Sequence, residues 1–382
     1  MATTVRPSIA IVAHNAYGAM SGGRTGHIGG IEWQTSLTAR WLAAAGHPVS
    51  LLTWDDGGRG DEDIDGVRVV KVCRREDGWP GLRFVHPRWT GLARALTRAR
   101  PDVCYQNGAE EVTGQVALWC RSAGRPFVFS SANDWDFDRR LPALDLRSRL
   151  LYRHGLRAAG DRIVQTLTQQ RMLRENFGLE STVIPMPCPG PADADHEPRT
   201  GPPSRRVLWI ARVTRQKRPD RLLEVARLRP DLEFDLVGPP DATDYSRDSI
   251  AAARATPNVT VHGPVEREGV QRFYRDAGLL VCTSDYEGFP NTFLEAWSRG
   301  VPIVSTFDPD GVIVRHGLGR VEQEPARLAQ GLGELLDAGD AYVEASARAR
   351  RYYRENHAAE AVLPRFARVF EEAAARRLTP SS

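Results

Sequence analysis

The sequence predicts an α/β protein made of two doubly wound parallel sheets. In both halves of the 382-residue chain, short apolar runs of strand length alternate with stretches of helix length, which is typical of parallel strands joined by helices. Between the halves, residues 187–205 are rich in proline and lack apolar periodicity, so they indicate a linker. We therefore expect an N-terminal domain over 1–198, a C-terminal domain over 199–357, and a ligand cleft between them.

The first half begins with an apolar strand over residues 8–13. A glycine-rich polar loop follows and ends at Gly29-Gly30, before a helix expected from about 32 to 45 that Gly46 closes. Further strands are expected at 49–53, 67–72, 102–106, 126–131, 162–165 and 182–185, with helices around 88–99, 110–123, 144–159 and 167–176. This order predicts a parallel sheet with helices on both faces.

The second half shows the same alternation. Its expected strands are 206–211, 233–237, 259–262, 279–283 and 301–305, and its expected helices include 219–228 and 266–277. A helix that Gly300 closes lies between the last two strands. Two further helical stretches, 341–353 and 358–376, end the pattern.

Composition excludes several classes of protein. The hydrophobic content of 41% and charged content of 26% are ordinary for a soluble globular chain, and the longest apolar runs have only strand length. The five cysteines are scattered, and the N-terminus shows no secretory signal, so we expect a cytoplasmic protein with reduced thiols. A net charge of +3 is too small to indicate a nucleic-acid partner.

Two glutamates, Glu287 and Glu295, stand out in the stretch 282–306, where they flank a predicted helix start. Residues 292–295 fit a capping box, so Glu295 has an alternative role as a helix cap in the first turn. Residues 284–287 have the same spacing, but Gly288 and a proline follow, so Glu287 caps nothing. A carboxylate beside a helix N-terminus, at the end of a parallel strand, suits a phosphorylated ligand with hydroxyl groups.

Two cations, Arg212 and Lys217, follow the strand at 206–211. At the carboxyl end of a strand they can bind a diphosphate, the arginine through its planar guanidinium and the lysine as a point charge. Basic residues before a helix are also commonly solvated, and Arg215 and Arg218 are competing candidates.

The stretch EGFPN with its second glutamate and the following Gly-Val-Pro strand resembles the donor-sugar motif of retaining glycosyltransferases of family four, which have the GT-B fold of two Rossmann-like domains. The strand–Gly29-Gly30–helix unit, the pair Arg212 and Lys217, and the segment VHGPV (261–265) are also similar to family features. The resemblance implies that Glu287 binds the donor sugar and Glu295 the ribose, and that the two cations and the Gly29-Gly30 helix end stabilise the diphosphate. It further implies donor contacts from Gly238, His262, Val265, Gly288, Phe289, Pro290, Asn291 and Thr292. Family members return a C-terminal helix, here 358–382, to the N-terminal domain.

The acceptor side departs from the family pattern. Many relatives have a histidine after the strand that here ends at residue 131, whereas this chain has Ala132-Asn133-Asp134. Asn133 or Asp134 replaces that contact, or the role belongs to His14 or Asn107. Nearby, arginines alternate with apolar residues over 139–157, which fits either a membrane-surface helix or a solvated basic face.

Several acidic patterns do not indicate a metal site. Residues 61–66 copy the start of a calcium loop, but position twelve is Val72 rather than glutamate. The D-x-D patterns at 134–136 and 308–310 are common by chance, and the nine histidines lack metal-ligand spacing. We expect no metal and no cofactor, the nucleotide sugar being a substrate.

The resemblance therefore implies a retaining glycosyltransferase that moves a sugar from a nucleoside-diphosphate sugar to a carbohydrate, lipid-linked or small-molecule acceptor. Polysaccharide, glycolipid or other glycoconjugate biosynthesis is the family's usual setting, in the cytoplasm or at the inner face of the membrane. The alternatives are a sugar-nucleotide epimerase of the same fold and a non-catalytic sugar-nucleotide-binding protein. A Rossmann dehydrogenase is disfavoured because no G-x-G-x-x-G follows the first strand.

Overall fold

The computed structural model describes residues 6–23, 29–58, 60–141, 144–191 and 198–378. The chain forms two compact units, Met1–Pro187 with Val362–Ser382, and Cys188–Ala361. Each unit contains one sheet and is described by itself below.

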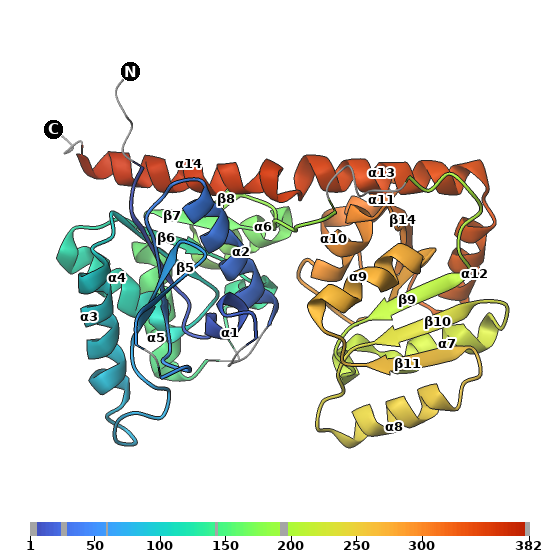
Figure 1. Ribbon diagram of the computed structural model, residues 1–382, viewed down its shortest axis with the longest axis horizontal. Helices are drawn as coiled ribbons and strands as arrows, with labels where there is room; N and C mark the ends of the chain where they lie inside the picture. The colour runs from blue at the N-terminus through green and yellow to red at the C-terminus, as the bar shows by residue number, and fades with distance from the viewer. Residues whose placement is uncertain (1–5, 24–28, 59, 142–143, 192–197, 379–382) are drawn as a thin grey trace. The chain divides into compact units, whose positions relative to one another are not determined.

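The sheet of unit 1 has eight strands in the order β3-β4-β2-β1-β5-β6-β7-β8. Figure 1 labels β5, β6, β7 and β8 of this sheet. Their bounds are β1 Ile9–Val12, β2 Val49–Thr53, β3 Glu62–Ile64, β4 Val67–Lys71, β5 Val103–Asn107, β6 Phe127–Ser130, β7 Asp161–Val164 and β8 Thr182–Val183. Every pairing is parallel except that of β3 with β4. The central strand β1 is buried along its whole length and pairs with both β2 and β5. The chain reverses direction across the sheet at this position, which is a topological switch point.

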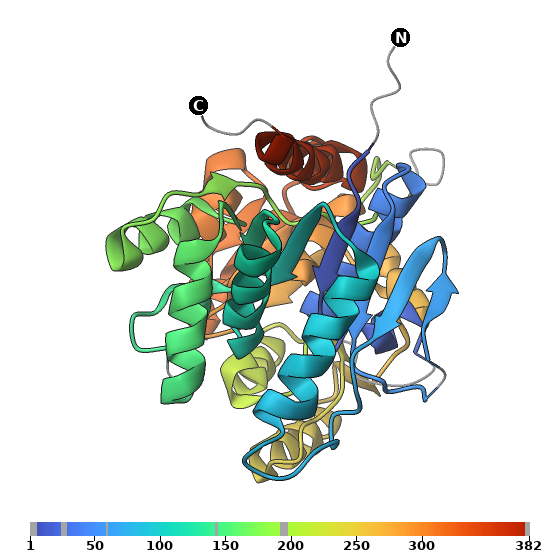
Figure 2. The same ribbon diagram turned by 90° about the vertical axis from the view of Figure 1, so that its left-hand side faces the viewer.

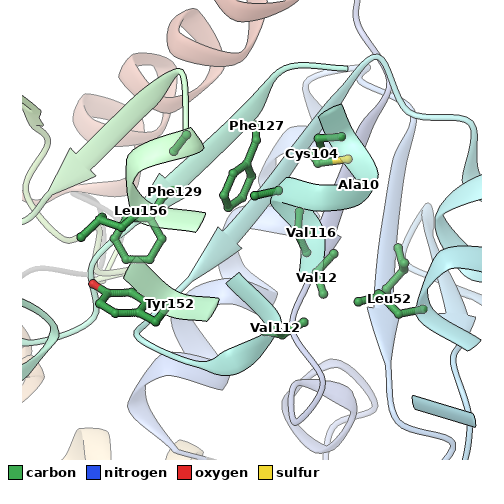
Figure 3. Packing of buried hydrophobic residues seen from close by; sticks show 14 of the residues in the cluster. Ala10, Val12, Leu52, Cys104, Val112, Val116, Phe127, Phe129, Tyr152 and Leu156 are labelled. Atoms are coloured by element: carbon green, nitrogen blue, oxygen red, sulfur yellow. The ribbon is translucent and has the colours of Figure 1, made fainter. Parts of the chain in front are cut away.

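Helices cover both faces of this sheet. The helices of unit 1 are α1 Tyr17–Met20, α2 Gly30–Ala44, α3 Thr90–Ala99, α4 Glu111–Ala123, α5 Leu146–Ala158 and α6 Leu167–Phe177, with short turns at Phe84–Trp89 and Asp134–Phe137. In Figure 2, α3, α4 and α5 (cyan to green) lie on the same side of the strands. Figure 3 shows the core between them, where Val116, Phe127 and Tyr152 are buried.

Two glycines allow α4 and α5 to pack closely. A Cβ at Gly114 would lie 2.4 Å from the carbonyl oxygen of Leu151, and one at Gly155 would lie 2.5 Å from the backbone of Thr113. The helix backbones are therefore in direct contact. The C-terminal helix α14, Ala359–Leu378, also contributes to unit 1, because Phe370 packs edge-on against Tyr105 of β5 at 5.3 Å.

The sheet of unit 2 has six parallel strands in the order β11-β10-β9-β12-β13-β14. Their bounds are β9 Arg206–Ile210, β10 Glu233–Val237, β11 Val259–Gly263, β12 Leu279–Cys282, β13 Ile303–Ser305 and β14 Gly319–Val321. The helices are α7 Pro219–Leu228, α8 Asp244–Arg254, α9 Arg267–Asp276, α10 Asn291–Ser298, α11 Val312–His316, α12 Pro325–Leu336 and α13 Asp340–Asn356. The order 3-2-1-4-5-6 is that of a dinucleotide-binding sheet, with its switch point between β9 and β12.

The predicted α/β class with two parallel sheets is confirmed. Six strands and α-helices were not predicted: β3, β14, α1, α8, α11 and α12. The helix expected from about residue 32 begins two residues earlier, at Gly30, and the acidic segment 61–66 belongs to the β3–β4 hairpin. Asp61 in that hairpin accepts a bond from the Lys71 N–H at 2.9 Å and forms an ion pair with Arg98.

Candidate active site

The charged side chains predicted to bind the donor lie in unit 2 at the carboxyl ends of β9 and β12. These neighbouring strands pair in parallel, with Val207 opposite Leu279, so the loops that follow them leave the same edge of the sheet. Ligands of open parallel sheets bind at such an edge, at the switch point. The first loop contains Arg212 and Lys217, and the second contains Glu287.

Lys217 and Glu287 form an ion pair at this edge. The Oε1 atom of Glu287 also accepts a hydrogen bond from the Ser284 hydroxyl at 2.6 Å. Side-chain exposures of 23% for the lysine and 12% for the glutamate show that water reaches both only partly. The two residues singled out by their sequence positions are thus brought together by the fold.

Hydrogen bonds join the two loops and hold this pair in place. Trp209 donates its indole N–H to the Thr283 hydroxyl at 2.9 Å, and that hydroxyl donates to the Lys217 carbonyl at 2.8 Å. Gln216 donates to the Tyr286 carbonyl at 2.8 Å. The sequence interpretation missed these supporting residues, since their roles depend on two loops being neighbours.

The cations near this edge differ in whether other side chains of the protein already bind them. Arg218 donates to both Asp220 and Asp285, so carboxylates already neutralise it. Burial by itself favours protonation of Asp220, but the bonds from Arg218 and Tyr245 outweigh it and lower the pKa of that carboxyl to about 2. The guanidinium of Arg215 lies over the Tyr245 ring, 4.6 Å from its centroid. Arg212 is exposed and, among the described residues, has no hydrogen bond or ion pair, so it stays available to a ligand.

The capping-box alternative for Glu295 is wrong. Helix α10 begins at Asn291, after Pro290 with its extended ψ of 125°, so Thr292 lies inside the helix rather than at its N-cap. Glu295 consequently lies in the second turn instead of the first. Its buried carboxylate accepts a hydrogen bond from the Tyr274 hydroxyl at 2.7 Å.

The other predicted donor residues surround the same edge. Gly238, just after β10, has φ 140°, and a Cβ there would lie 1.9 Å from the Ala211 carbonyl oxygen, so only glycine allows the strand ends to approach. His262 of β11 has its Nε2 2.7 Å from Asp235 Oδ1, which directs the ring toward the sheet and leaves main-chain groups for contact. Val265, two residues beyond β11, is half-buried.

The loop before α10 is anchored by its aromatic residue. The ring of Phe289 packs against His357 with centroids 5.0 Å apart and against Trp297 at 6.2 Å. Gly288 on one side is half-buried, and Pro290 on the other is buried. The first helical residues, Asn291 and Thr292, have backbone N–H groups of the kind that a helix leaves without an internal acceptor.

In unit 1, Gly29 and Gly30 mark the start of α2. Gly29 is the N-cap in an extended conformation with φ −103°, and Gly30 is the first helical residue. The polar loop before them includes residues 24–28, which lie outside the described residues. How this helix start relates to the donor residues of unit 2 stays a prediction.

The four acceptor-side candidates fall into two pairs. Asn133 accepts from the Trp135 N–H at 2.9 Å, and Asp134 accepts from Gln169 at 3.0 Å, so both are engaged locally. His14 and Asn107, after β1 and at the end of β5, instead have buried polar atoms, Nε2 and Oδ1, that find no hydrogen-bond partner among the described residues. The fold therefore favours the second pair for ligand contact.

A cavity of about 390 Å³ opens beside His14. The imidazole stacks on Trp54 with centroids 3.9 Å apart. Burial, together with the nearby charges of Arg88 and Arg75, lowers the pKa of His14 to about 3, so the ring is neutral. The sequence interpretation missed the other cavity residues, because they come from separate loops.

Comparison with known proteins agrees with this geometry. A family model described as a glycosyl transferase 4-like domain matches residues 29–189, and one described as glycosyl transferases group 1 matches residues 194–352. The chain belongs to the group 1 glycosyltransferases. The resemblance inferred from the sequence is confirmed.

The curated relatives carry glycosyltransferase names, and the solved structures share the fold. The glycosyltransferase is 26% identical over 359 residues to D-inositol 3-phosphate glycosyltransferase of Frankia alni, covering 82% of this chain and 87% of the relative. For two Mycolicibacterium relatives of that name, the match spans only 33% and 26% of their length. Sucrose-phosphate synthase from Thermosynechococcus elongatus superposes with a TM-score of 0.78 at 17% identity, over 97% of this chain and 100% of that one. HepE from Anabaena, in complex with UDP and glucose, has a TM-score of 0.74 at 15% identity, over 96% and 100%. The fold of the glycosyltransferase is thus GT-B, as expected.

Two further properties concern the described part of the glycosyltransferase. Its helices are all too short or too polar to cross a membrane. Nowhere among the described residues do three or more histidine, cysteine, aspartate or glutamate side chains converge as they would around a metal ion.

Proposed function

We propose that this glycosyltransferase moves a sugar from a nucleoside-diphosphate sugar to an acceptor hydroxyl with retention of anomeric configuration. The observation that carries the proposal is the ion pair of Lys217 and Glu287 at the switch point of the unit 2 sheet. The Lys217 ammonium suits a diphosphate, and the Glu287 carboxylate beside it suits the hydroxyl groups of a sugar. The bond that breaks joins that sugar to that diphosphate.

The donor contacts follow from this placement. Lys217 and Arg212 bind the diphosphate, and Glu287 accepts hydrogen bonds from the donor sugar. Glu295 accepts from the ribose hydroxyls while Tyr274 holds its carboxylate. The base lies against the backbone near Gly238, His262 and Val265, and the segment 288–292 offers backbone N–H groups to the donor.

The chemical step needs no protein nucleophile and no cofactor. The acceptor oxygen forms a bond to the anomeric carbon on the face that the diphosphate leaves, the bond from that carbon to the diphosphate breaks, and a diphosphate oxygen takes the acceptor proton. Positive charge from Lys217 and Arg212, supplemented by the helix N-terminus at Gly29-Gly30, stabilises the negative charge that develops.

The acceptor is a carbohydrate, a lipid-linked saccharide or a small polyol. Relatives named D-inositol 3-phosphate glycosyltransferase support including inositol phosphates among the acceptors to be tested. The reaction belongs to polysaccharide, glycolipid or other glycoconjugate biosynthesis, in the cytoplasm at the inner face of the membrane.

An exposed apolar surface in unit 1 supports contact with a membrane. The segment 79–85 and the start of α5 adjoin each other, since the guanidinium of Arg147 lies 4.0 Å from the centroid of the Phe84 ring. The exposed apolar side chains there are Trp79, Leu82, Val85, Leu146 and Leu150. Apolar side chains with neighbouring arginines are typical of surfaces that bind anionic bilayers. Co-sedimentation with anionic vesicles, lost in a W79S/L82S variant, tests this contact.

The experiment for the proposed function is transfer and hydrolysis with a panel of UDP-, GDP- and ADP-sugars. K217M and E287Q should each lower turnover roughly a hundredfold or more, by analogy with losing one preorganised transition-state contact. The matched control is Arg227→Gln, a substitution at an exposed position on α7 of the same unit. Near-normal rates in both variants would overturn the assignment. Donor conversion without any acceptor would indicate an epimerase, and donor binding without turnover a non-catalytic protein.

A further inference from the structure

The cavity in unit 1 lies where the sheet topology predicts a ligand. It opens at the carboxyl ends of β1 and β2 and beside the N-terminus of α4, which follows β5. Since β1 and β5 are the neighbours at the switch point, this position in unit 1 corresponds to the position in unit 2 where Lys217 and Glu287 lie. A volume of about 390 Å³ is within the range of small-molecule sites.

Three buried polar groups in the cavity wall lack hydrogen-bond partners among the described residues. They are Nε2 of His14, Nε of Arg88 and Nε2 of Gln115. His14 and Gln115 are more than nine-tenths buried, at 8% and 4% exposure. Buried polar groups are almost always satisfied, so three orphans around one cavity point to a polar occupant.

One side of the cavity is cationic. Arg75 donates to the Asn15 side chain at 2.6 Å, and Arg88 donates to the Arg75 carbonyl at 3.0 Å and lies over the Trp54 ring at 5.5 Å. Within the described ranges neither guanidinium has a carboxylate partner in an ion pair. Because His14 is neutral, it adds a hydrogen-bonding group and no charge. Two uncompensated cations at one wall favour an anionic group in the ligand.

The lining of the cavity also includes the carboxyl group of Glu110. Glu110, the N-cap residue of α4, is accessible through the cavity opening, while the protein around its carboxyl and the charges of Glu32, Asp136 and Glu111 raise its pKa to about 7. Glu111 is already occupied, accepting from Arg147 at 3.0 Å. Glu110 forms the capping box of α4 with Thr113, but a carboxyl has further acceptor positions, so Glu110 is the carboxyl that can also bind a hydroxyl group of a ligand.

We propose that this cavity is the acceptor site and that its acceptor is a small polyol with one anionic group, a phosphate or a carboxylate. The anionic group binds Arg75 and Arg88, and the hydroxyl groups bind His14, Gln115 and Glu110. The role as acceptor rests on the proposed function, whereas the binding of an anionic polyol does not.

Calorimetry with the full chain tests the binding. The probes are glycerol, hexose and inositol monophosphates and a hexuronate, each paired with its neutral counterpart. At least one anionic probe should bind about tenfold or more tightly than its neutral counterpart. R75Q and R88Q should each weaken that binding roughly ten- to hundredfold, as expected for one charge-assisted hydrogen bond. Arg121→Gln, an exposed change on α4, should leave it unchanged.

Two results would overturn the proposal: equal binding of every anionic and neutral probe, or binding that R75Q does not weaken. Since Arg75 is exposed, R75Q remains informative if R88Q fails to fold. Repeating the titration with vesicles of phosphatidylinositol distinguishes a lipid headgroup from a soluble phosphate as the natural source. Donor hydrolysis by wild-type protein is measured in parallel. Arginine-dependent binding without any donor turnover would refute the proposed function and leave the anionic site standing.

Discussion

Replacing Glu287 by glutamine keeps the size of the side chain and removes the charge that neutralises Lys217. Breaking a fully buried pair costs about 3–5 kcal/mol, whereas an exposed pair contributes about 0–1 kcal/mol. Side-chain exposures of 12% and 23% lie between these limits, and the bond from Ser284 is weakened as well. We therefore expect E287Q to lower the free energy of unfolding of unit 2 by about 2 kcal/mol.

A double-mutant cycle isolates the pair. K217M should destabilise unit 2 to a similar extent, and the double variant should be more stable than the sum of the two losses predicts, by about 1–3 kcal/mol. Urea denaturation is followed by tryptophan fluorescence, to which the buried Trp209 and Trp297 of unit 2 contribute together with the tryptophans of unit 1.

The control is Glu233→Gln, which breaks an exposed ion pair with Arg206 in the same unit and should change stability by less than about 0.5 kcal/mol. Losses for E287Q and K217M that add to within about 0.3 kcal/mol would refute the reasoning. Additivity would mean that the two side chains do not stabilise each other in solution.

Three further changes have defined outcomes. Gly238→Ala should cost about 3 kcal/mol or more in thermal unfolding, because its Cβ meets a carbonyl oxygen at 1.9 Å with φ at 140°, whereas Gly201→Ala, with open space around it, should be nearly neutral. Tyr274→Phe should raise the KM for the donor and cost about 2 kcal/mol of stability, since it removes a hydrogen bond to the buried Glu295 carboxylate; an unchanged KM would exclude Glu295 as a donor contact. The pKa of His14 is about 3 in the folded protein and 6.5 in the unfolded chain. Below pH 6.5 the unfolded chain therefore binds a proton that the folded protein does not, and the free energy of unfolding falls by on the order of 4 kcal/mol as the pH falls from 6.5 toward 3. His14→Asn should remove that part of the acid sensitivity, and stability curves that fall in parallel for both proteins would contradict it.

Sequence periodicity predicted most of the architecture because a buried parallel strand needs a continuous apolar run. Helix α8 escaped prediction since its buried residues are Ser246, Ser249 and Ala253, which leave no apolar stripe. Strand β14 has only three residues. Helix α12 did carry a signal, with Pro325 at its start and a buried leucine every four residues to Leu336, and it was overlooked.

The site was predicted unevenly. Glu287 and Lys217 each drew attention by position after a strand, although they are 70 residues apart and only the pairing of β9 with β12 brings them together. Glu295 matched a local capping pattern, and the structure contradicted it because Pro290 starts the helix earlier and Tyr274, from another helix, supplies the hydrogen bond.

The sequence by itself determined the α/β class, the family and the donor motif, because each depends on apolar runs or on residues a few positions apart. Tertiary structure alone decided which cations remain available, since Arg218 is neutralised by Asp285 from a distant loop. It also decided which acceptor candidates face a cavity, because β1, β2 and β5 meet only in the folded sheet. Burial and neighbouring charge, which set the neutral state of His14, arise from contacts between segments that are distant in the sequence.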